Sequence, residues 1–437
     1  MFGRLFRYNK KSKTEPKLFA AGRYSDNNKS IKQAAHWTDA ENLFKEKKYY
    51  ECIDAFFRYL KDEQVDNVVY QKTDSGFTFL IYQGSKIIRG TGNPDHLHAK
   101  TTLAKMPQPS VPVMRRLLEN NYLLFYSRFS LDDEKLVMQF DSEIATANPN
   151  KLYYALKELC TTADKQDDLL IQDFALLETF ENDHVIPISE NEKQLKYDQI
   201  HKWINEALDA IKDLETEKHS GAITFLILAL VYRIDYLATP EGGLMLELEK
   251  IQGIFFRKDN LSAMEKNRLM LAGIEKFRQH TKEEFFNSFF KSVSTFSIRA
   301  PKSHQAIRES ITAANKNVPW NRDNNYPEIG RQVSEYGIAF CQYSYSLPKP
   351  VSELFQLFMQ VNYPDYFTAL GLETEYYNIP DNRFKTVEIE SCIESIIQRW
   401  KNKYTKLSFP SNKLKYDNLM EFNFSYTNIL ADLDLDT

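Results

Sequence analysis

Residues 111–141, VPVMRRLLENNYLLFYSRFSLDDEKLVMQFD, change from a helical to an alternating hydrophobic pattern. Ser110 can cap a helix at the start of this segment. The apolar face of that helix would consist of Val113, Met114, Leu117 and Leu118. Apolar side chains then alternate over 123–131 and again over 136–140, which predicts a β-hairpin with an acidic turn between its strands.

A helix and three strands are predicted before this segment. The helix is expected to begin at Thr38, because Thr38 and Glu41 have the spacing of a capping box. The stretches NVVYQK, FTFLIY and SKIIRG follow and are separated by turn residues, so they read as three short strands. A long helix is expected from Pro149. Residues 37–183 are thus predicted to form an α+β domain, ordered helix, three strands, helix, two strands, helix, with an antiparallel sheet.

The second half of the chain has a different pattern. Long stretches with a 3.6-residue hydrophobic period follow one another from residue 184 to 437, which predicts a mainly α-helical domain. The Pro- and Asn-rich residues 300–326 are expected to form a boundary loop that subdivides it. The apolar run at 222–232 is about half of the roughly 20 residues that a spanning helix needs, so a buried helix and no transmembrane segment are expected.

Residues 1–36 are basic and contain few apolar groups, which indicates a flexible arm. They lack the continuous apolar run of an export signal. Contact with an anionic membrane surface is an alternative role for this arm, because Phe2, Leu5 and Phe6 lie beside its cations.

Composition narrows the class of protein. A chain of 437 residues with 43% hydrophobic and 27% charged residues is expected to fold as two or three domains. Its formal net charge of −4 gives no overall field for attracting nucleic acid, so no nucleic-acid partner is expected. The four cysteines are widely spaced and form no CxxC pair, which favours a reducing cytoplasm.

Candidate chemistry is sparse, and no catalytic, metal-binding or cofactor-binding residue is assigned. His96 and His98 would share a strand face, but no third ligand is evident, so NPDHLHAK is interpreted as a polar loop. Asp235 follows the long apolar run and is interpreted as a helix end that meets solvent. The basic and aromatic stretch QRWKNKYTKLSF is interpreted as a solvated helix face that Trp400 anchors to the core.

The helix, hairpin and following helix of 111–164 resemble the C-terminal half of the fold shared by type III secretion chaperones and the YbjN-type sensory-transduction-regulator family. The resemblance covers about a third of the chain, residues 38–180, and its motifs are mostly packing and turn residues. It implies a non-enzymatic, often dimeric domain that receives a segment of another protein on its sheet and helix surfaces. The outward positions that this implies are Leu80, Tyr82, Leu124, Tyr126 and Val137. The long helical extension departs from these small chaperones, and an open alternative is that it covers those positions.

The leading hypothesis is a cytoplasmic protein that binds another protein, in a chaperone-like or regulatory role, through the apolar and aromatic surface of its α+β domain. One alternative is an enzyme of unrecognised class with a site in the cleft between the two halves. A second alternative is a structural role through homo-oligomerisation.

Overall fold

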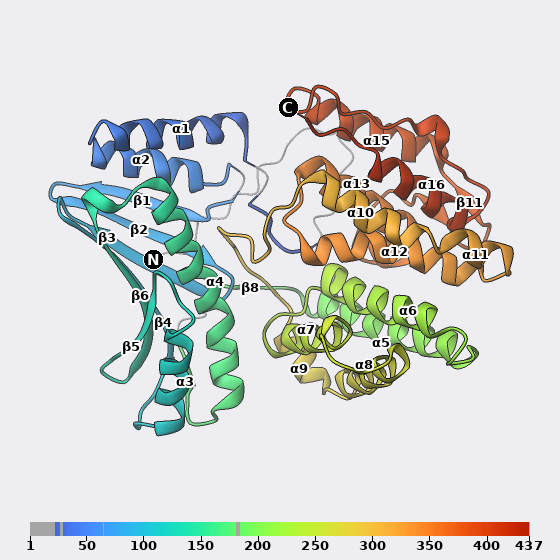
Figure 1. Cartoon of the computed structure of the whole chain (residues 1–437), viewed down its shortest axis with the longest axis horizontal. Helices are drawn as coiled ribbons and strands as arrows, with labels where there is room; N and C mark the ends of the chain where they lie inside the picture. The colour runs from blue at the N-terminus through green and yellow to red at the C-terminus, as the bar shows by residue number, and fades with distance from the viewer. Residues whose placement is uncertain (1–21, 27–28, 64, 181–183, 437) are drawn as a thin grey trace. The chain divides into compact units, whose positions relative to one another are not determined.

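The computed structural model describes residues 22–26, 29–63, 65–180 and 184–436 (Figure 1). Most of the predicted basic arm, residues 1–21, lies outside the described residues. The predicted fold class is confirmed: an antiparallel sheet with helices forms the N-terminal half, and the C-terminal half is mainly helical. The fold is therefore α+β.

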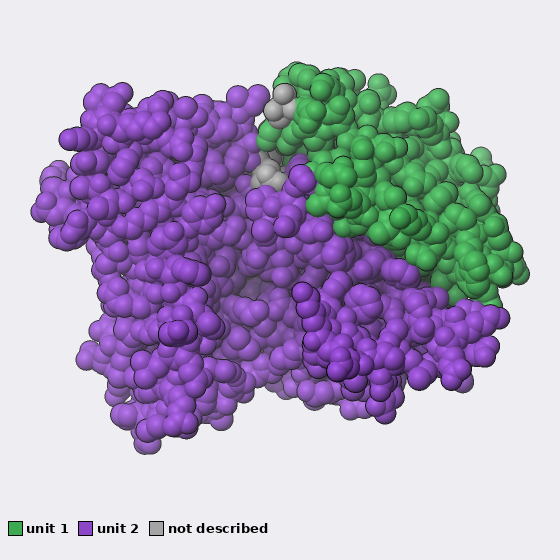
Figure 2. Space-filling model, viewed as in Figure 1, with its two compact units in different colours: residues 1–21, 304–334, 349–437 green, residues 22–303, 335–348 purple. Residues whose placement is uncertain are grey.

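Two compact units, coloured in Figure 2, divide the chain. The larger unit contains Gly22–Ser303 and Glu335–Pro348, and the smaller unit contains His304–Ser334 and Lys349–Thr437. The predicted boundary at residue 184 separates no compact units, because the sheet and the helices that follow it belong to one unit. The chain passes from the larger to the smaller unit after Ser303 and returns to the larger unit for Glu335–Pro348.

Within the described residues, the larger unit holds a seven-stranded sheet with the order β1-β2-β3-β4-β6-β5, and β7 pairs with the remaining edge of β4. Its inner face is apolar because every second side chain, such as Phe77, Phe79 and Ile81 on β2, points to the core. Its strands are β1 (Val68–Thr73), β2 (Gly76–Gln83), β3 (Lys86–Gly92), β4 (His96–Lys105), β5 (Arg128–Asp132), β6 (Lys135–Glu143) and β7 (Glu178–Thr179).

Helices α2 and α4 pack on the inner face of this sheet, and α1 packs on both of them. The predicted helix start at Thr38 is wrong. Ser30 caps α1 and forms a capping box with Gln33, so the helix begins at Ile31 and continues through Thr38. The predicted start of α4 is confirmed, with Asn148 as its cap. The elements are α1 (Ile31–Lys45), α2 (Tyr49–Leu60), α3 (Val111–Asn121), the 3-10 turn η1 (Ile144–Thr146) and α4 (Pro149–Asp173).

Two predictions around the sheet are wrong in detail. NPDHLHAK is no polar loop, because His96 begins β4, the strand that pairs with β3, β6 and β7. The predicted β-hairpin is present, but its first strand starts at Arg128 instead of residue 123. Residues 122–127 form a loop, although their alternating pattern is that of a strand.

The rest of the larger unit is mainly helical, with one short two-stranded pairing of β8 and β9. Ser220–Ala238 is the one helical segment of the described residues that is long and apolar enough to cross a membrane, yet 83% of its most apolar window is buried inside the protein. The predicted buried helix at 222–232 is thus confirmed, as expected for a helix that is apolar all round. The elements are β8 (Ile186–Pro187), α5 (Glu190–Lys212), α6 (Ser220–Arg233), the π-helical turn η2 (Ile234–Ala238), α7 (Gly242–Phe256), α8 (Ala263–Arg278), α9 (Lys282–Asn287) and β9 (Phe290–Lys291).

The smaller unit is built around α13 and α16, whose core includes the buried Tyr426, with its hydroxyl donating to Leu354 O at 2.8 Å. The predicted anchor is present, since Trp400 Nε1 donates to the buried Glu353 at 3.3 Å. The predicted loop at 300–326 is instead largely helical. The elements are α10 (His304–Asn315), α11 (Val318–Asp323), α12 (Pro327–Ser344, shared between the units), α13 (Lys349–Asn362), α14 (Pro364–Ala369), β10 (Tyr377–Asn378), β11 (Arg383–Phe384), α15 (Thr386–Trp400), the 3-10 turn η3 (Ser411–Lys413) and α16 (Leu419–Ala431).

Candidate protein-binding surface

The five side chains expected to face outward lie at different depths. Leu80 and Tyr82 on β2 are half-buried, and Leu124 is half-buried against the hydrophobic core. Tyr126 is 40% exposed, whereas Val137 is 1% exposed. Tyr126 is therefore the most exposed member of this set.

The expectation that Val137 is accessible is wrong, although Val137 does lie on the outer face of the sheet. The ring of Phe180 lies over the ammonium group of Lys135, 5.1 Å from it, and Lys135 is two residues from Val137 on the same strand face. Phe180 thus lies on the outer face close to this end of β6. On β2, the centre of the Tyr82 ring lies 5.9 Å from the centre of the His184 ring.

The most exposed cluster of large apolar side chains lies in residues 122–126, here named the aromatic loop. Tyr122 is 92% exposed, Phe125 is 90% exposed and Leu123 is 73% exposed. Leu118, one turn earlier on α3, is 68% exposed. Single exposed apolar residues are ordinary, but several in succession indicate a contact surface.

The main chain of the aromatic loop is fixed by one carboxylate, Glu158 of α4. The backbone N–H groups of Phe125, Tyr126 and Ser127 donate to it at 2.9, 2.9 and 2.8 Å. The Ser127 hydroxyl donates to the same carboxylate at 2.6 Å. Four donors on one charged acceptor hold the backbone in a single arrangement while its rings stay exposed.

Next to the aromatic loop, the edge strand β5 cannot pair freely with an added strand, because the outward-facing backbone groups of Phe129 are already bonded. Phe129 on β5 donates its backbone N–H to Asn121 Oδ1 at 2.6 Å, and its carbonyl accepts from Asn121 Nδ2 at 3.1 Å. β5 is an edge strand, so these are the groups that an added strand would use. Contact through the exposed rings is thus better supported here than added strand pairing.

A second candidate site is a cavity of about 230 Å³ between α4, β4 and the first turn of α7. Its polar lining includes Lys86, Asp167, Asp168 and Gln172. Lys86 bonds to Asp167 Oδ2 at 2.8 Å and to the carbonyls of Leu103 and Phe180 at 3.3 and 3.2 Å. All three of its donors are thereby used, which leaves none for a substrate.

The carboxyl groups along α4 near this cavity have unusual acidities. Burial, together with the charge of Asp167, raises the pKa of Asp164 to about 7. Burial and the charges of Asp167 and Asp164 raise the pKa of Asp168 to about 8. Such shifts are frequent at catalytic sites, but crowded structural carboxylates produce them as well.

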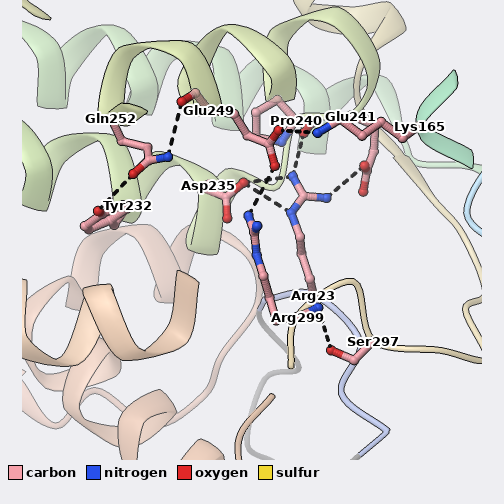
Figure 3. A network of polar contacts seen from close by, with 10 residues as sticks. All are labelled: Arg23, Lys165, Tyr232, Asp235, Pro240, Glu241, Glu249, Gln252, Ser297 and Arg299. Atoms are coloured by element: carbon pink, nitrogen blue, oxygen red, sulfur yellow. Dashed lines mark hydrogen bonds and ion pairs between the residues drawn. The ribbon is translucent and has the colours of Figure 1, made fainter. Parts of the chain in front are cut away.

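A buried ion network joins residues 22–26 to the helices that follow the sheet (Figure 3). Arg23 donates to Asp235 Oδ1 at 2.9 and 3.1 Å, to Glu241 at 2.8 Å and to Pro240 O at 2.9 Å. Burial opposes the charge of Arg23, but the two carboxylates outweigh it and raise its pKa. The interpretation of Asp235 as a solvent-facing helix end is wrong, since Asp235 is 5% exposed.

The main chain at this junction requires a glycine. Gly22 has a φ of +83°, and a Cβ atom built there would lie 2.4 Å from the Tyr236 ring. Its backbone N–H donates to Tyr236 O at 3.0 Å. Gly22 and Arg23, expected within a flexible arm, are thus integral to the larger unit.

Among the residues that the structure describes, no group of three or more His, Cys, Asp or Glu side chains is placed to hold a metal ion. His98 is bonded to Asp141, with 2.6 Å between Nδ1 and Oδ1, at the exposed outer face. All four cysteines are buried and form no disulfide, and burial raises the pKa of Cys52 to about 12, so that thiol is a poor nucleophile.

The local sequence could not identify several of these residues. The Arg23–Asp235 pair spans 212 positions, and Glu158 lies 31 to 33 positions from its donors. The run ADKQDD in α4 did contain a usable signal, because three carboxylates on adjoining turns of one helix must repel each other when they are buried. No model of a known protein family matches the chain, and a search of curated proteins finds no relative.

Proposed function

We propose that this protein acts by binding another protein, in a chaperone-like or regulatory role, and that the aromatic loop is its principal contact. The observation that carries the proposal is the combination of large exposed side chains with a main chain that Glu158 fixes. Aromatic residues are enriched at the centres of protein interfaces. A backbone that is already ordered loses little conformational entropy on binding, so more of the contact energy appears as affinity.

The resemblance to the type III secretion chaperone and YbjN-type fold supports the same class of function. It implies partner binding by the domain that contains the aromatic loop. The half-buried Leu80, Tyr82 and Leu124 are secondary contacts in this proposal, and Tyr126 belongs to the principal one. A cytoplasmic location is part of the proposal and rests on the cysteine usage of the sequence.

A photo-crosslinking residue in place of Phe125 tests the proposal in cells that make the protein. We expect one or a few discrete crosslinked products from this position. Val387 on α15 is 75% exposed and apolar, so the same replacement there is a matched control that is expected to give only diffuse background. Equal products from both positions would contradict the proposal.

The variant Tyr122→Ser/Phe125→Ser separates lost binding from lost folding. Because both rings are exposed, the free energy of unfolding of this variant is expected to lie within about 0.5 kcal/mol of the wild-type value. It should nevertheless lose the products formed from a crosslinker at position 123. A crosslinked product of twice the chain mass, obtained from the purified protein alone, would identify the partner as a second copy of the chain.

Enzymatic activity is the second candidate function, and the cavity beside Asp168 is the observation that favours it. Against it, all three N–H donors of the Lys86 ammonium group are already bonded within the protein, so none is left for a substrate. Native mass measurement of the purified protein discriminates between the two functions, because a retained small molecule would favour an enzyme and a retained protein would favour the binding function.

A further inference from the structure

The cavity of about 230 Å³ between α4, β4 and the first turn of α7 reaches from solvent into the larger unit. Of the residues that line it, Lys86, Leu103 and Asp167 are buried, whereas Gln172 and Thr179 are exposed. A water molecule takes up about 30 Å³ of the liquid, so the cavity has room for a small organic molecule. Its hydrogen-bonding groups and charges indicate which kind of molecule fits.

The acceptors of this cavity are less fully used than its ammonium donors. All three N–H donors of the Lys86 ammonium group are bonded within the protein. Asp167 is 4% exposed, and its Oδ2 accepts from Lys86 and from Ser85 Oγ, each at 2.8 Å. Its Oδ1 is also buried, yet no residue that the structure describes donates to it. A buried carboxylate oxygen without a donor is unfavourable, and a ligand that donates a hydrogen bond would remove this cost.

Negative charge is in excess near this cavity. Asp164, Asp167 and Asp168 lie on adjoining turns of α4, and Lys86 is the one cation among the described residues that line the cavity. Burial and the repulsion from Asp167 and Asp164 raise the pKa of Asp168 to about 8. A positively charged ligand would reduce this repulsion, and the formal net charge of −4 also favours a cation.

The other walls of the cavity favour an organic cation over a metal ion. Leu103 and Ile171 line it with aliphatic side chains, which cannot bind a metal. Within the described residues, no three His, Cys, Asp or Glu side chains are placed to hold one. An alkyl chain that carries an ammonium group complements both the aliphatic wall and the carboxyl groups.

We propose that this cavity binds a primary ammonium group carried on a short alkyl chain. The ammonium group donates to Asp168 and to Oδ1 of Asp167, and the alkyl chain lies against Ile171. A free small amine and the lysine side chain of another protein share this chemistry, and a peptide probe distinguishes them. This inference does not depend on the aromatic loop and goes beyond the proposed function.

Isothermal titration calorimetry of the full chain at about pH 8 tests this proposal, with n-butylamine as the probe and n-butanol as its neutral match. Binding of n-butylamine and none of n-butanol is expected, because only the amine is positively charged at this pH. Tetramethylammonium carries the charge without an N–H donor and should bind about tenfold more weakly than n-butylamine. Equal binding of either match would overturn the proposal.

A Gly-Lys-Gly peptide with blocked termini identifies the source of the ammonium group. If the peptide binds at least as tightly as n-butylamine, the cavity is assigned to a lysine side chain of another protein. If the peptide binds more weakly, the cavity is assigned to a free amine. Tighter binding of Ca²⁺ or Mg²⁺ than of n-butylamine would overturn the proposal in favour of a metal site.

The variant Asp168→Asn should weaken n-butylamine binding about tenfold or more, because a charge-assisted hydrogen bond is lost. Asp173→Asn is the matched control, since it makes the same change in net charge on the same helix, at an exposed carboxylate that pairs with Arg116. This control should bind n-butylamine like the wild type. Equal affinities in the two variants would contradict the assignment of the ammonium group to Asp168 and overturn the proposal.

Gly243 on α7 allows a substitution that fills the cavity and leaves the carboxyl groups unchanged. A Cβ atom built there lies 3.7 Å from Gln172 Nε2, which is an ordinary contact. Gly243→Leu is therefore expected to block n-butylamine, while its Tm equals or exceeds that of the wild type because leucine is a better helix former than glycine. Unchanged binding in a folded Gly243→Leu protein would place the ligand elsewhere and overturn the proposal.

The pH dependence of binding separates a ligand contact from a merely structural role of Asp168. Between about pH 6 and pH 8.5 the affinity for n-butylamine should rise, because Asp168 loses its proton while the amine, like lysine with its pKa of about 10.4, keeps its own. Asp168→Asn should flatten this rise. The same slope in both proteins would overturn the proposal.

Discussion

The aromatic loop and the Arg23 network depart from the usual distribution of side chains in opposite ways. The aromatic loop exposes large rings, with Tyr122 and Phe125 at 92% and 90%. The Arg23 network buries charges, with Asp235 at 5%. Both features concentrate in the larger unit, and each raises the question of what compensates for it.

The two features differ in whether the chain itself supplies partners for the unusual side chains. Arg23 meets two carboxylates and a carbonyl at hydrogen-bonding distance, so folding by itself accounts for its burial. In the aromatic loop, the bonds to Glu158 satisfy the main chain, and the rings remain in water. A buried charge with its partners thus indicates a structural role, whereas the ordered apolar surface is the feature on which the proposed partner binding rests.

The largest expected effect is the loss of stability in the variant Arg23→Ala. It leaves the buried Asp235 and the half-buried Glu241 without their cation, which is expected to lower the free energy of unfolding by about 3 kcal/mol. Urea denaturation of the full chain measures this effect.

Arg128→Ala is the matched control, because its pair with Asp141 is exposed on both sides. A change of about 0–1 kcal/mol is expected for it. Equal losses in the two variants would remove the distinction between buried and exposed ion pairs on which the comparison depends.

A smaller effect is expected for Glu158→Ala, which removes the acceptor of four donors. The loss should be about 2 kcal/mol, because hydrogen bonds to a charged group are among the stronger ones and the freed N–H groups lie near solvent. Hydrogen exchange followed by mass spectrometry should show faster exchange at residues 125–127, with β6 unchanged. Unchanged exchange there would show that Glu158 does not fix the aromatic loop, and the proposed function would lose its main support.

The elements that were predictable are those with local signals. Asn148 and Pro149 mark the start of α4 within two residues, and the apolar run of α6 identifies a core helix by composition alone. β4 was missed because Ala99 and Thr101 contribute little hydrophobic contrast on its buried side, while His98 and Lys100 dominate the other side. Its identity as a strand depends on pairing with β3 and β6.

The candidate surface was predictable only in part. The pattern of 123–131 cannot distinguish a strand from an ordered loop, because both present alternating apolar residues. The hydrogen bonds of Glu158 and Asn121 decide for a loop before Arg128, and neither can be read from local periodicity. Tyr126 was expected to face outward from a strand, and it is 40% exposed but lies in a loop. Val137 does lie on the outer face of the sheet, yet it is 1% exposed, and strand alternation alone cannot predict that burial.

The smallest expected effect concerns the carboxyl groups of α4. Fewer opposite charges and hydrogen bonds offset the charge of Asp168 than offset the charge of Arg23. Asp168 is surrounded by Asp167, Asp164 and Glu241, with Lys86 as the nearby cation, and its pKa is raised from an ordinary value of 3.8 to about 8. The fold therefore favours the protonated carboxyl.

The sign of the pH dependence follows from that raised pKa. The contribution of Asp168 to stability is fully present below about pH 4 and is lost as the pH rises toward 8. Asp168→Asn should flatten this decline, by on the order of 1 kcal/mol between pH 5 and pH 9 in urea denaturation, since solvent near the half-buried group screens part of the shift. Asp173→Asn, an exposed change on the same helix, is the control and should decline like the wild type. If the stability of all three proteins declines in parallel with pH, the charge of Asp168 is offset within the fold, as that of Arg23 is. The cavity beside Asp168 would then lack the raised pKa that makes it a candidate site.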